Sequence, residues 1–185
     1  APKEKNNEKN QIWRDRLRKH RQRIPSAALR RVEGAQLVWA CDLIEERAQK
    51  AKDDFGFEKY TLDYHDILND SSIDAVCIFT KIEMHATLCI EAAAAGKHIF
   101  SQKPFAYNIE EGRKIIRAVD EAGVKLTPSF MHSYMDGSIA ARRIVEEGKI
   151  GEIRHIRMRN ATKNPFDSAP GYGGCMMDIG CTGWT

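Results

Sequence analysis

The sequence has no glycine before Gly34, and this absence limits what its N-terminal part can bind. A phosphate-binding loop uses glycines because only a backbone without side chains approaches phosphate groups closely enough. Residues 1–33 therefore contain no such loop. No apolar run approaches the roughly 20 residues that span a bilayer, and no apolar stretch follows the first lysines as a secretory signal requires. We expect a cytoplasmic protein with no membrane partner.

The sequence also lacks a C-x-x-C pair, and its five cysteines are an odd number. Cys41 and Cys77 lie in apolar, strand-like runs, and Cys89 lies in a helical pattern. These contexts favour buried free thiols over disulfides or metal ligands, so we expect no metal site.

Positive charge is concentrated at the N-terminus. Residues 1–31 hold 11 Lys/Arg against 3 Asp/Glu, a net charge of +8, and the remainder holds 18 against 23, a net of −5. Basic arms can bind nucleic acid, but solvated helices and tails have the same composition. We favour a basic lead-in over residues 1–23, disordered or helical, and do not expect nucleic acid as a partner.

From residue 24 onward, short apolar runs alternate with helical segments that end at glycines. This alternation indicates βαβ units, and so an α/β fold with a doubly wound parallel sheet over residues 24–150. Proline in the last of the apolar runs indicates a strand end or sheet edge. The predicted strands are 35–40, 73–80, 97–101 and 124–130, and the predicted helices are 26–32, 45–55, 83–95, 109–122 and 137–147.

The pattern changes after residue 150. Residues 152–160 are charged and partly alternating, as in a strand with one face in water, and residues 161–174 are rich in turn-forming residues. A further element starts near residue 173 and is cut short by the end of the sequence. We interpret residues 151–185 as the beginning of a second α/β domain.

Ligands of open parallel sheets bind beyond the carboxyl ends of the strands, which makes the residues there candidates for a site. Asp42 could accept hydrogen bonds from a ribose diol or could cap the next helix. Thr80 ends the next strand, and His85 follows near a helix start, where a surface histidine is the more common case. Lys103 precedes Pro104, which favours an extended backbone that could aim the ammonium into a cleft as a proton donor or oxyanion stabiliser, although a solvated lysine is equally expected.

Asp178 lies in an apolar segment flanked by Gly173, Gly174 and Gly180. A carboxylate in such surroundings needs a partner. A helix cap, a satisfied core aspartate and a ligand contact all remain open.

Several of these segments together resemble a known family. The runs IDAVCIFT, GKHIFSQKP, EAGVKLTPSFMH, EEGKIGEI and GGCMMDIGC, in this order and spacing, resemble the glucose–fructose oxidoreductase/inositol dehydrogenase/MocA family over residues 24–185. The resemblance implies a Rossmann domain that binds NAD or NADP, followed by a domain that carries the substrate site and the oligomer interface. It implies hydride transfer between the nicotinamide and a sugar, cyclitol or related polyol, and a homo-oligomer for the complete protein.

The resemblance also assigns roles by position. Lys103 matches the lysine of the family's E-K-P motif, which contacts substrate and nicotinamide ribose and whose bond to proline is often cis. Asp178 matches a substrate and proton-relay position. The matching cofactor-contacting positions are Asp42, Thr80, His85, Gln102, Lys103 and Pro104. Leu43 after Asp42, in place of an arginine, slightly favours NAD.

Three departures from the family pattern predict impaired activity. Gln102 replaces the acid of E-K-P, and Thr182 replaces the histidine that usually acts as general acid or base. A threonine hydroxyl does not titrate near neutral pH, so proton transfer would run through Lys103 or water. The first strand and its glycine loop are missing, so we do not expect this chain to hold the dinucleotide as it stands. The alternative hypothesis is a non-catalytic relative that binds sugars or acts as a scaffold.

Overall fold

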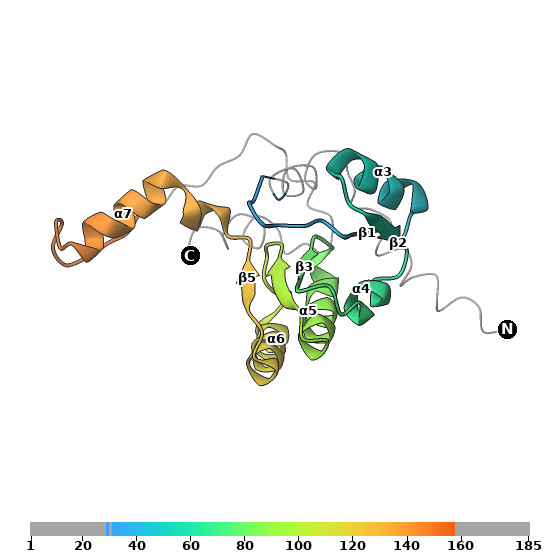
Figure 1. Ribbon diagram of the computed structural model, residues 1–185. Helices are drawn as coiled ribbons and strands as arrows, with labels where there is room; N and C mark the ends of the chain where they lie inside the picture. The colour runs from blue at the N-terminus through green and yellow to red at the C-terminus, as the bar shows by residue number, and fades with distance from the viewer. Residues whose placement is uncertain (1–28, 30, 158–185) are drawn as a thin grey trace, which may run out of the picture.

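A computed structural model describes residue 29 and residues 31–157 of the chain (Figure 1). Parallel strands and connecting helices alternate along it. In chain order the elements are β1 (Trp39–Cys41), α3 (Glu45–Phe55), β2 (Lys59–Thr61), α4 (His65–Asn69), β3 (Ala75–Ile78), η1 (Ile82–Met84), α5 (His85–Ala94), β4 (His98–Ser101), α6 (Ile109–Ala122), β5 (Leu126–Pro128), η2 (Met131–Tyr134) and α7 (Asp136–Glu146).

Helices α3 and α6 have the predicted bounds because their ends are encoded locally. The backbone N–H of Glu111 donates to Asn108 Oδ1 at 2.9 Å, and the Glu111 carboxylate accepts from the N–H of Tyr107 at 3.3 Å. This is a capping box shifted by one residue on its return bond. Gly56 and Gly123 end the two helices at φ 74° and 67°, a conformation that side chains disfavour.

The strands form two parallel sheets rather than one. In the first, β1 pairs with β2, and in the second the order is β3-β4-β5. A doubly wound dinucleotide-binding sheet has the order 3-2-1-4-5-6. The two observed sheets match the two flanks of that order, and no strand of the described residues joins them.

The core lies on one face of the second sheet, against α5 and α6 (Figure 1). Its buried members are Ile78, Leu88, Cys89, Ala92, Ala93, Ile99, Ile115 and Val119. On the opposite face, Ala75 and Cys77 of β3 and His98 of β4 are exposed. Parallel sheets are normally covered on both faces, so this sheet is half covered within the described residues.

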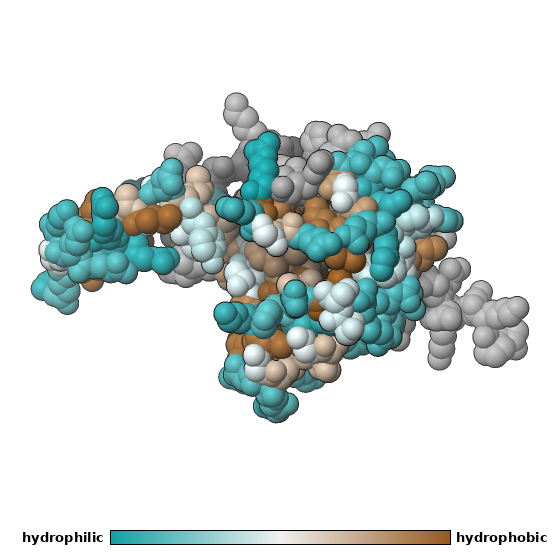
Figure 2. All heavy atoms as spheres, viewed as in Figure 1, coloured by the Kyte–Doolittle hydropathy of each residue, from teal (hydrophilic) through white to brown (hydrophobic). Residues whose placement is uncertain are grey.

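The C-terminal part of the described chain departs from the prediction. Helix α7 extends away from the sheets, and its apolar residues Ile139, Ile144 and Val145 are exposed (Figures 1 and 2). A strand was predicted over residues 152–160, but residues 152–157 adopt no regular structure, and residues 158–160 lie outside the described part. An edge strand needs a neighbour to pair with, and none is present among the described residues.

Candidate functional site

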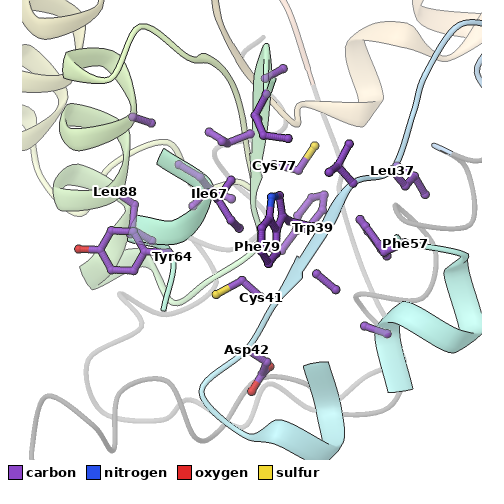
Figure 3. Close-up of a pocket in the computed structure, with 18 of the residues that line it drawn as sticks. Leu37, Trp39, Cys41, Asp42, Phe57, Tyr64, Ile67, Cys77, Phe79 and Leu88 are labelled. Atoms are coloured by element: carbon purple, nitrogen blue, oxygen red, sulfur yellow. The ribbon is translucent and has the colours of Figure 1, made fainter. Parts of the chain in front are cut away.

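The ends of β1 and β3 open into one pocket of about 280 Å³ (Figure 3). Asp42 and Thr80, both predicted site residues, line it at these ends. Apolar side chains make up most of the rest, contributed by β1, β3 and the helices beside them. The structure thus brings together two strand ends that are separated by 38 positions in the sequence, 42 to 80.

Asp42 is half-buried where β1 leads into α3. Its Oδ1 accepts a hydrogen bond from the backbone N–H of Ile44 at 2.9 Å, which orders the turn. Burial raises the pKa of this carboxyl, while the Ile44 N–H and the charge of Arg47 act in the opposite direction. Asp42 therefore does not cap α3 as the alternative prediction had it, because Ile44 is the N-cap and has no side-chain cap, but one Asp42 carboxylate oxygen orders the preceding turn and the side chain borders the pocket.

His85 is buried, with 1% of its surface exposed, whereas the sequence favoured a surface histidine. Its Nδ1 lies 2.9 Å from the carbonyl oxygen of Pro104, and its Nε2 lies 3.3 Å from that of Thr80. A neutral imidazole donates to one of these carbonyls and a protonated one to both. The ring therefore joins the end of β3 to the turn after β4, and it stands between two predicted site residues.

Lys103 and Pro104 form the turn after β4, and the peptide bond between them is cis. The backbone N–H of Gln102 donates to the carbonyl of Ile78 at 2.9 Å, which extends the β3–β4 ladder by one bond. Pro104 is buried, while Gln102 and Lys103 are half-exposed. The backbone at these predicted site positions is thus fixed by the sheet and by His85.

Three cysteines lie in the described region, and only one of them matches the expectation of buried thiols. Cys89 is buried, Cys41 is half-buried and Cys77 is exposed on the uncovered face of β3. Desolvation by surrounding protein atoms raises the pKa of Cys41 to about 12 and those of Cys77 and Cys89 to about 11, although part of the Cys77 surface reaches solvent. All three are therefore neutral thiols near pH 7.

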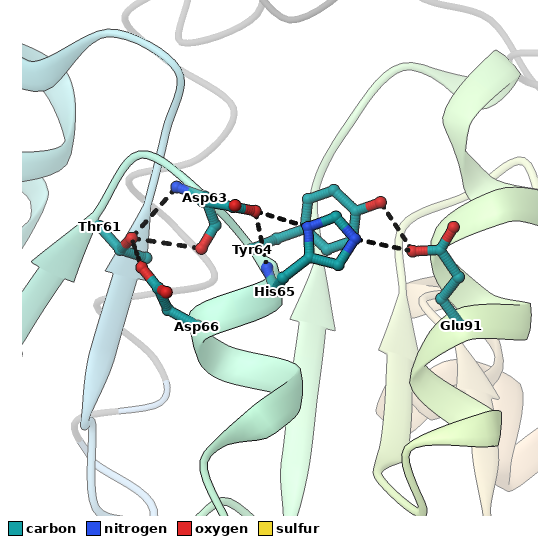
Figure 4. Close-up of polar contacts among 6 residues, drawn as sticks. All are labelled: Thr61, Asp63, Tyr64, His65, Asp66 and Glu91. Carbon is teal, nitrogen blue, oxygen red and sulfur yellow. Dashed lines mark hydrogen bonds and ion pairs between the residues drawn. The ribbon is translucent and has the colours of Figure 1, made fainter.

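A polar network between β2, α4 and α5 was not foreseen from the sequence (Figure 4). Asp63 Oδ1 lies 2.6 Å from His65 Nδ1, and His65 Nε2 lies 3.7 Å from Glu91 Oε2. The Tyr64 hydroxyl donates to Glu91 at 2.7 Å. The network joins the β1–β2 half to the α5 half, and acidic and aromatic residues spaced 27 positions apart carry no sequence signal for such a contact.

Two of the predicted catalytic residues, Asp178 and Thr182, lie outside the described residues, so their predicted roles stay predictions. Over residue 29 and residues 31–157, no group of three or more His, Cys, Asp or Glu side chains is arranged to hold a metal ion. Within the same residues, no helix is long and apolar enough to cross a membrane.

Comparison with known proteins identifies the family. Residues 18–130 match the family described as "Oxidoreductase family, NAD-binding Rossmann fold" (GFO_IDH_MocA). The chain is 34% identical to inositol 2-dehydrogenase of Salmonella typhimurium, over 75% of this chain and 43% of that protein. It is 36% identical to scyllo-inositol 2-dehydrogenase (NAD(+)) of Bacillus subtilis, over 80% of this chain and 44% of that protein.

Comparison with solved structures leads to similar dehydrogenases. A levoglucosan dehydrogenase in complex with NADH and levoglucosan matches with a TM-score of 0.61 at 34% identity, over 63% of this chain and 31% of that one. Myo-inositol 2-dehydrogenase of Lactobacillus plantarum matches with a TM-score of 0.65 at 28% identity, over 72% and 40%. The chain spans less than half the length of these relatives. It belongs to the glucose–fructose oxidoreductase/inositol dehydrogenase/MocA family of oxidoreductases, in its NAD-binding Rossmann part.

Proposed function

We propose that this chain is part of an NAD(P)-dependent oxidoreductase that transfers hydride between the nicotinamide and an inositol, sugar or related polyol, and that it is impaired as it stands. The observation that carries the proposal is the His85 ring, which holds the end of β3 at Thr80 against the turn at Pro104. That contact holds the Lys103 turn beside the carboxyl end of β3, and ligands of open parallel sheets bind at this edge.

The residues present fit only part of a dinucleotide. Asp42 borders the pocket at the end of β1 and offers a carboxylate to a ribose diol. No glycine precedes Gly34, so no G-x-G-x-x-G loop, the element that brings backbone close to a pyrophosphate in this fold, stands ahead of β1 in the sequence given. We therefore propose that the complete enzyme uses NAD and that this chain, as it stands, binds NAD weakly or not at all.

The catalytic roles are assigned by matching residues of this sequence to positions in the family's motifs. Lys103 would orient the reacting hydroxyl, and Asp178 would share in moving its proton. Thr182 would bind substrate without titrating, because a hydroxyl has no pKa near neutrality. Loss of a general acid or base lowers rates by about 10²–10⁴-fold, so residual activity would be slow.

A titration of NADH fluorescence tests the cofactor part. This chain is compared with a version in which a strand and a G-x-G-x-x-G loop precede residue 24, and with a matched version whose loop glycines are alanines. We expect NADH binding by the glycine version alone. Failure of the glycine version, with a circular dichroism spectrum that indicates an intact fold, would refute the proposal.

The alternative is a non-catalytic relative that binds sugars or serves as a scaffold, and Gln102, Thr182 and the absent loop favour it. Thermal melting separates the two functions, because only a bound ligand raises the melting temperature. A rise with myo-inositol or glucose and none with NADH, in both the chain and its glycine version, would support the sugar-binding role.

The remaining properties of the complete protein are proposed by analogy with the family. We propose residues 24–150 as the Rossmann-like domain, residues 151–185 as the start of the substrate and oligomer domain, a homo-oligomeric state and a cytoplasmic location. The exposed apolar side chains of α7 are consistent with a covering partner there. Gel filtration with multi-angle light scattering of the full-length protein tests the oligomer.

A further inference from the structure

His85 is enclosed by protein, although the family pattern matches it to a cofactor-contacting position. It begins helix α5, and 1% of its surface is exposed. Among the described residues it is not one of those that line the pocket at the ends of β1 and β3. Both of its ring nitrogens face backbone carbonyl oxygens, those of Pro104 and Thr80. This geometry suits a side chain that holds other parts of the protein in place rather than one that touches a ligand.

The two contacts of the ring are unequal. Nδ1 lies 2.9 Å from the Pro104 carbonyl oxygen, which is the usual length of an N–H···O hydrogen bond. The 3.3 Å from Nε2 to the Thr80 carbonyl oxygen lies beyond the usual range of about 2.7–3.2 Å. A neutral imidazole carries one ring proton, so the shorter contact is the hydrogen bond and Nδ1 is its donor. One directed bond therefore ties α5 to the turn after β4.

Lys103 stands between two anchored neighbours in this turn. Before it, the backbone N–H of Gln102 donates to the Ile78 carbonyl at 2.9 Å. After it, the Pro104 carbonyl accepts from His85. A side chain leaves the backbone in a direction that its two flanking peptide units set, so two fixed units fix the direction of the Lys103 side chain. The first anchor is part of the β3–β4 ladder, whereas the second depends on one side chain.

The direction of the Lys103 side chain matters for the proposed reaction, in which this lysine orients the reacting hydroxyl. A misplacement of about 1 Å, even when it arises far from the reacting atoms, costs about 10²-fold in rate. A turn anchored only at Gln102 leaves the lysine free to swing about that point. The rate of the proposed reaction therefore depends on a residue that touches neither substrate nor cofactor.

We propose that His85 is a positioning residue: its Nδ1–H holds the Pro104 carbonyl, this bond sets the direction of the Lys103 side chain, and the ring makes no contact with the cofactor. The effect on turnover rests on the proposed function, whereas the link from His85 to Lys103 does not.

Two substitutions at His85 separate the roles of the two ring nitrogens. The amide nitrogen of asparagine lies close to the place of Nδ1, whereas that of glutamine lies close to the place of Nε2. His85→Asn therefore keeps a donor for the Pro104 carbonyl, and His85→Gln removes it. His132→Asn changes an exposed histidine and is the matched control.

The first measurement is made on this chain and reports the proton on the ring. Nitrogen-15 NMR of the protein labelled at histidine distinguishes the two tautomers, and we expect the Nδ1–H form for His85. This spectroscopic signature belongs to the parent protein, so it decides the donor even if a variant fails to fold.

The second measurement reports the freedom of Lys103, also on this chain. Acetylation of each lysine is followed by mass spectrometry, with exposed Lys114 as the reference for half-exposed Lys103. In His85→Gln we expect the difference in rate between these two lysines to disappear, and in His85→Asn and His132→Asn to persist. Buried Lys97 is the internal control, because it becomes reactive only if the protein unfolds.

The third measurement is steady-state oxidation of myo-inositol with NAD by the complete protein. We expect His85→Gln to lower kcat by about 10²-fold and to leave the KM for NAD unchanged. His85→Asn should recover part of this loss, because it restores the donor to the Pro104 carbonyl. A general loss of stability would not separate these two variants by the position of their amide nitrogen.

Three results would overturn the proposal. An Nε2–H tautomer would leave the Pro104 carbonyl without a donor from the ring. Equal acetylation of Lys103 in the parent and in folded His85→Gln would mean that the turn does not depend on the ring. A raised KM for NAD with an unchanged kcat would make His85 a cofactor contact. An inactive parent protein refutes the proposed function instead, and the tautomer and acetylation rates then decide whether His85 positions Lys103.

Discussion

Replacing His85 by alanine tests whether one buried ring holds the two strand ends together. In the structure the ring is 1% exposed, with Nδ1 2.9 Å from the Pro104 carbonyl and Nε2 3.3 Å from the Thr80 carbonyl. Alanine removes both contacts and leaves a cavity of nearly ring size. The change is confined to the junction between the end of β3 and the turn after β4.

The expected cost is the sum of a lost hydrogen bond and a lost packing volume. A typical intramolecular hydrogen bond contributes about 0.5–1.5 kcal/mol, and the shorter Nδ1 contact is the stronger of the two. Large-to-alanine changes in cores cost about 2–5 kcal/mol. Because imidazole is smaller and more polar than a phenyl ring, we expect His85→Ala to lower the free energy of unfolding by about 2–4 kcal/mol.

Urea denaturation followed by far-UV circular dichroism measures this cost. His85→Asn is the conservative variant, because its amide can donate to the Pro104 carbonyl, and it should recover about 1 kcal/mol. His132→Ala is the control for an exposed histidine and should change stability by no more than about 0.5 kcal/mol. If His85→Ala costs no more than His132→Ala, the ring does not fasten the strand ends and the reasoning is wrong.

Three further predictions concern the scaffold around the site. Lys97 is buried, and its Nζ donates to the carbonyls of Asp70 at 2.7 Å and Ile73 at 2.9 Å. Lys97→Met should lower the free energy of unfolding by about 2–3 kcal/mol, and Lys97→Arg should lower it less. Equal melting temperatures of Lys97→Met and the parent protein would contradict this prediction. Hydrogen bonds from Ser72 and from Trp39 Nε1 hold the pKa of Asp70 well below its usual range. The contribution of Asp70 to stability is therefore present above the ordinary carboxyl pKa and is lost as pH falls through the lowered value. Asp70→Asn should flatten the decline of the urea midpoint below about pH 4, and an unchanged decline would contradict the prediction. A methyl group at Gly112, in the first turn of α6, meets Phe105 and Ala106 at 3.6 and 3.7 Å, which are ordinary contact distances, so Gly112→Ala should stabilise by about 0.5–1 kcal/mol. Gly123→Ala at φ 67° should destabilise by about 1 kcal/mol. Calorimetry that finds the same sign for both would refute the distinction.

The sequence predicts those parts of the fold whose signals are local. Helices α3 and α6 carry their own ends in the pattern of Asn108, Glu111 and two glycines in the left-handed conformation. Strand β2 and helix α4 are missed because three and five residues hold too little periodicity to stand out. Strand β1 is shorter than the predicted run 35–40 because only Trp39–Cys41 pair in register with β2.

The candidate site is predictable as a set of positions but not as an arrangement. Asp42, Thr80 and Lys103 are identified from the sequence because each follows a predicted strand, and ligands of parallel sheets bind at the carboxyl ends of the strands. The same reasoning wrongly assigns His85 to the surface, because a position near a helix start carries no information about burial. The cis turn after β4 covers this helix start, and that contact joins residues 19 positions apart.

In the described residues the two sheets are linked by side chains and not by a shared strand. A sheet edge presents backbone donors and acceptors, and a buried polar group without a partner costs about 1–3 kcal/mol, so two such edges do not pack directly against each other without hydrogen bonds. Each flank is instead held by its own crossover helices, α3 on one side and α5 with α6 on the other, and by the links from Trp39 to Asp70 and from Tyr64 to Glu91.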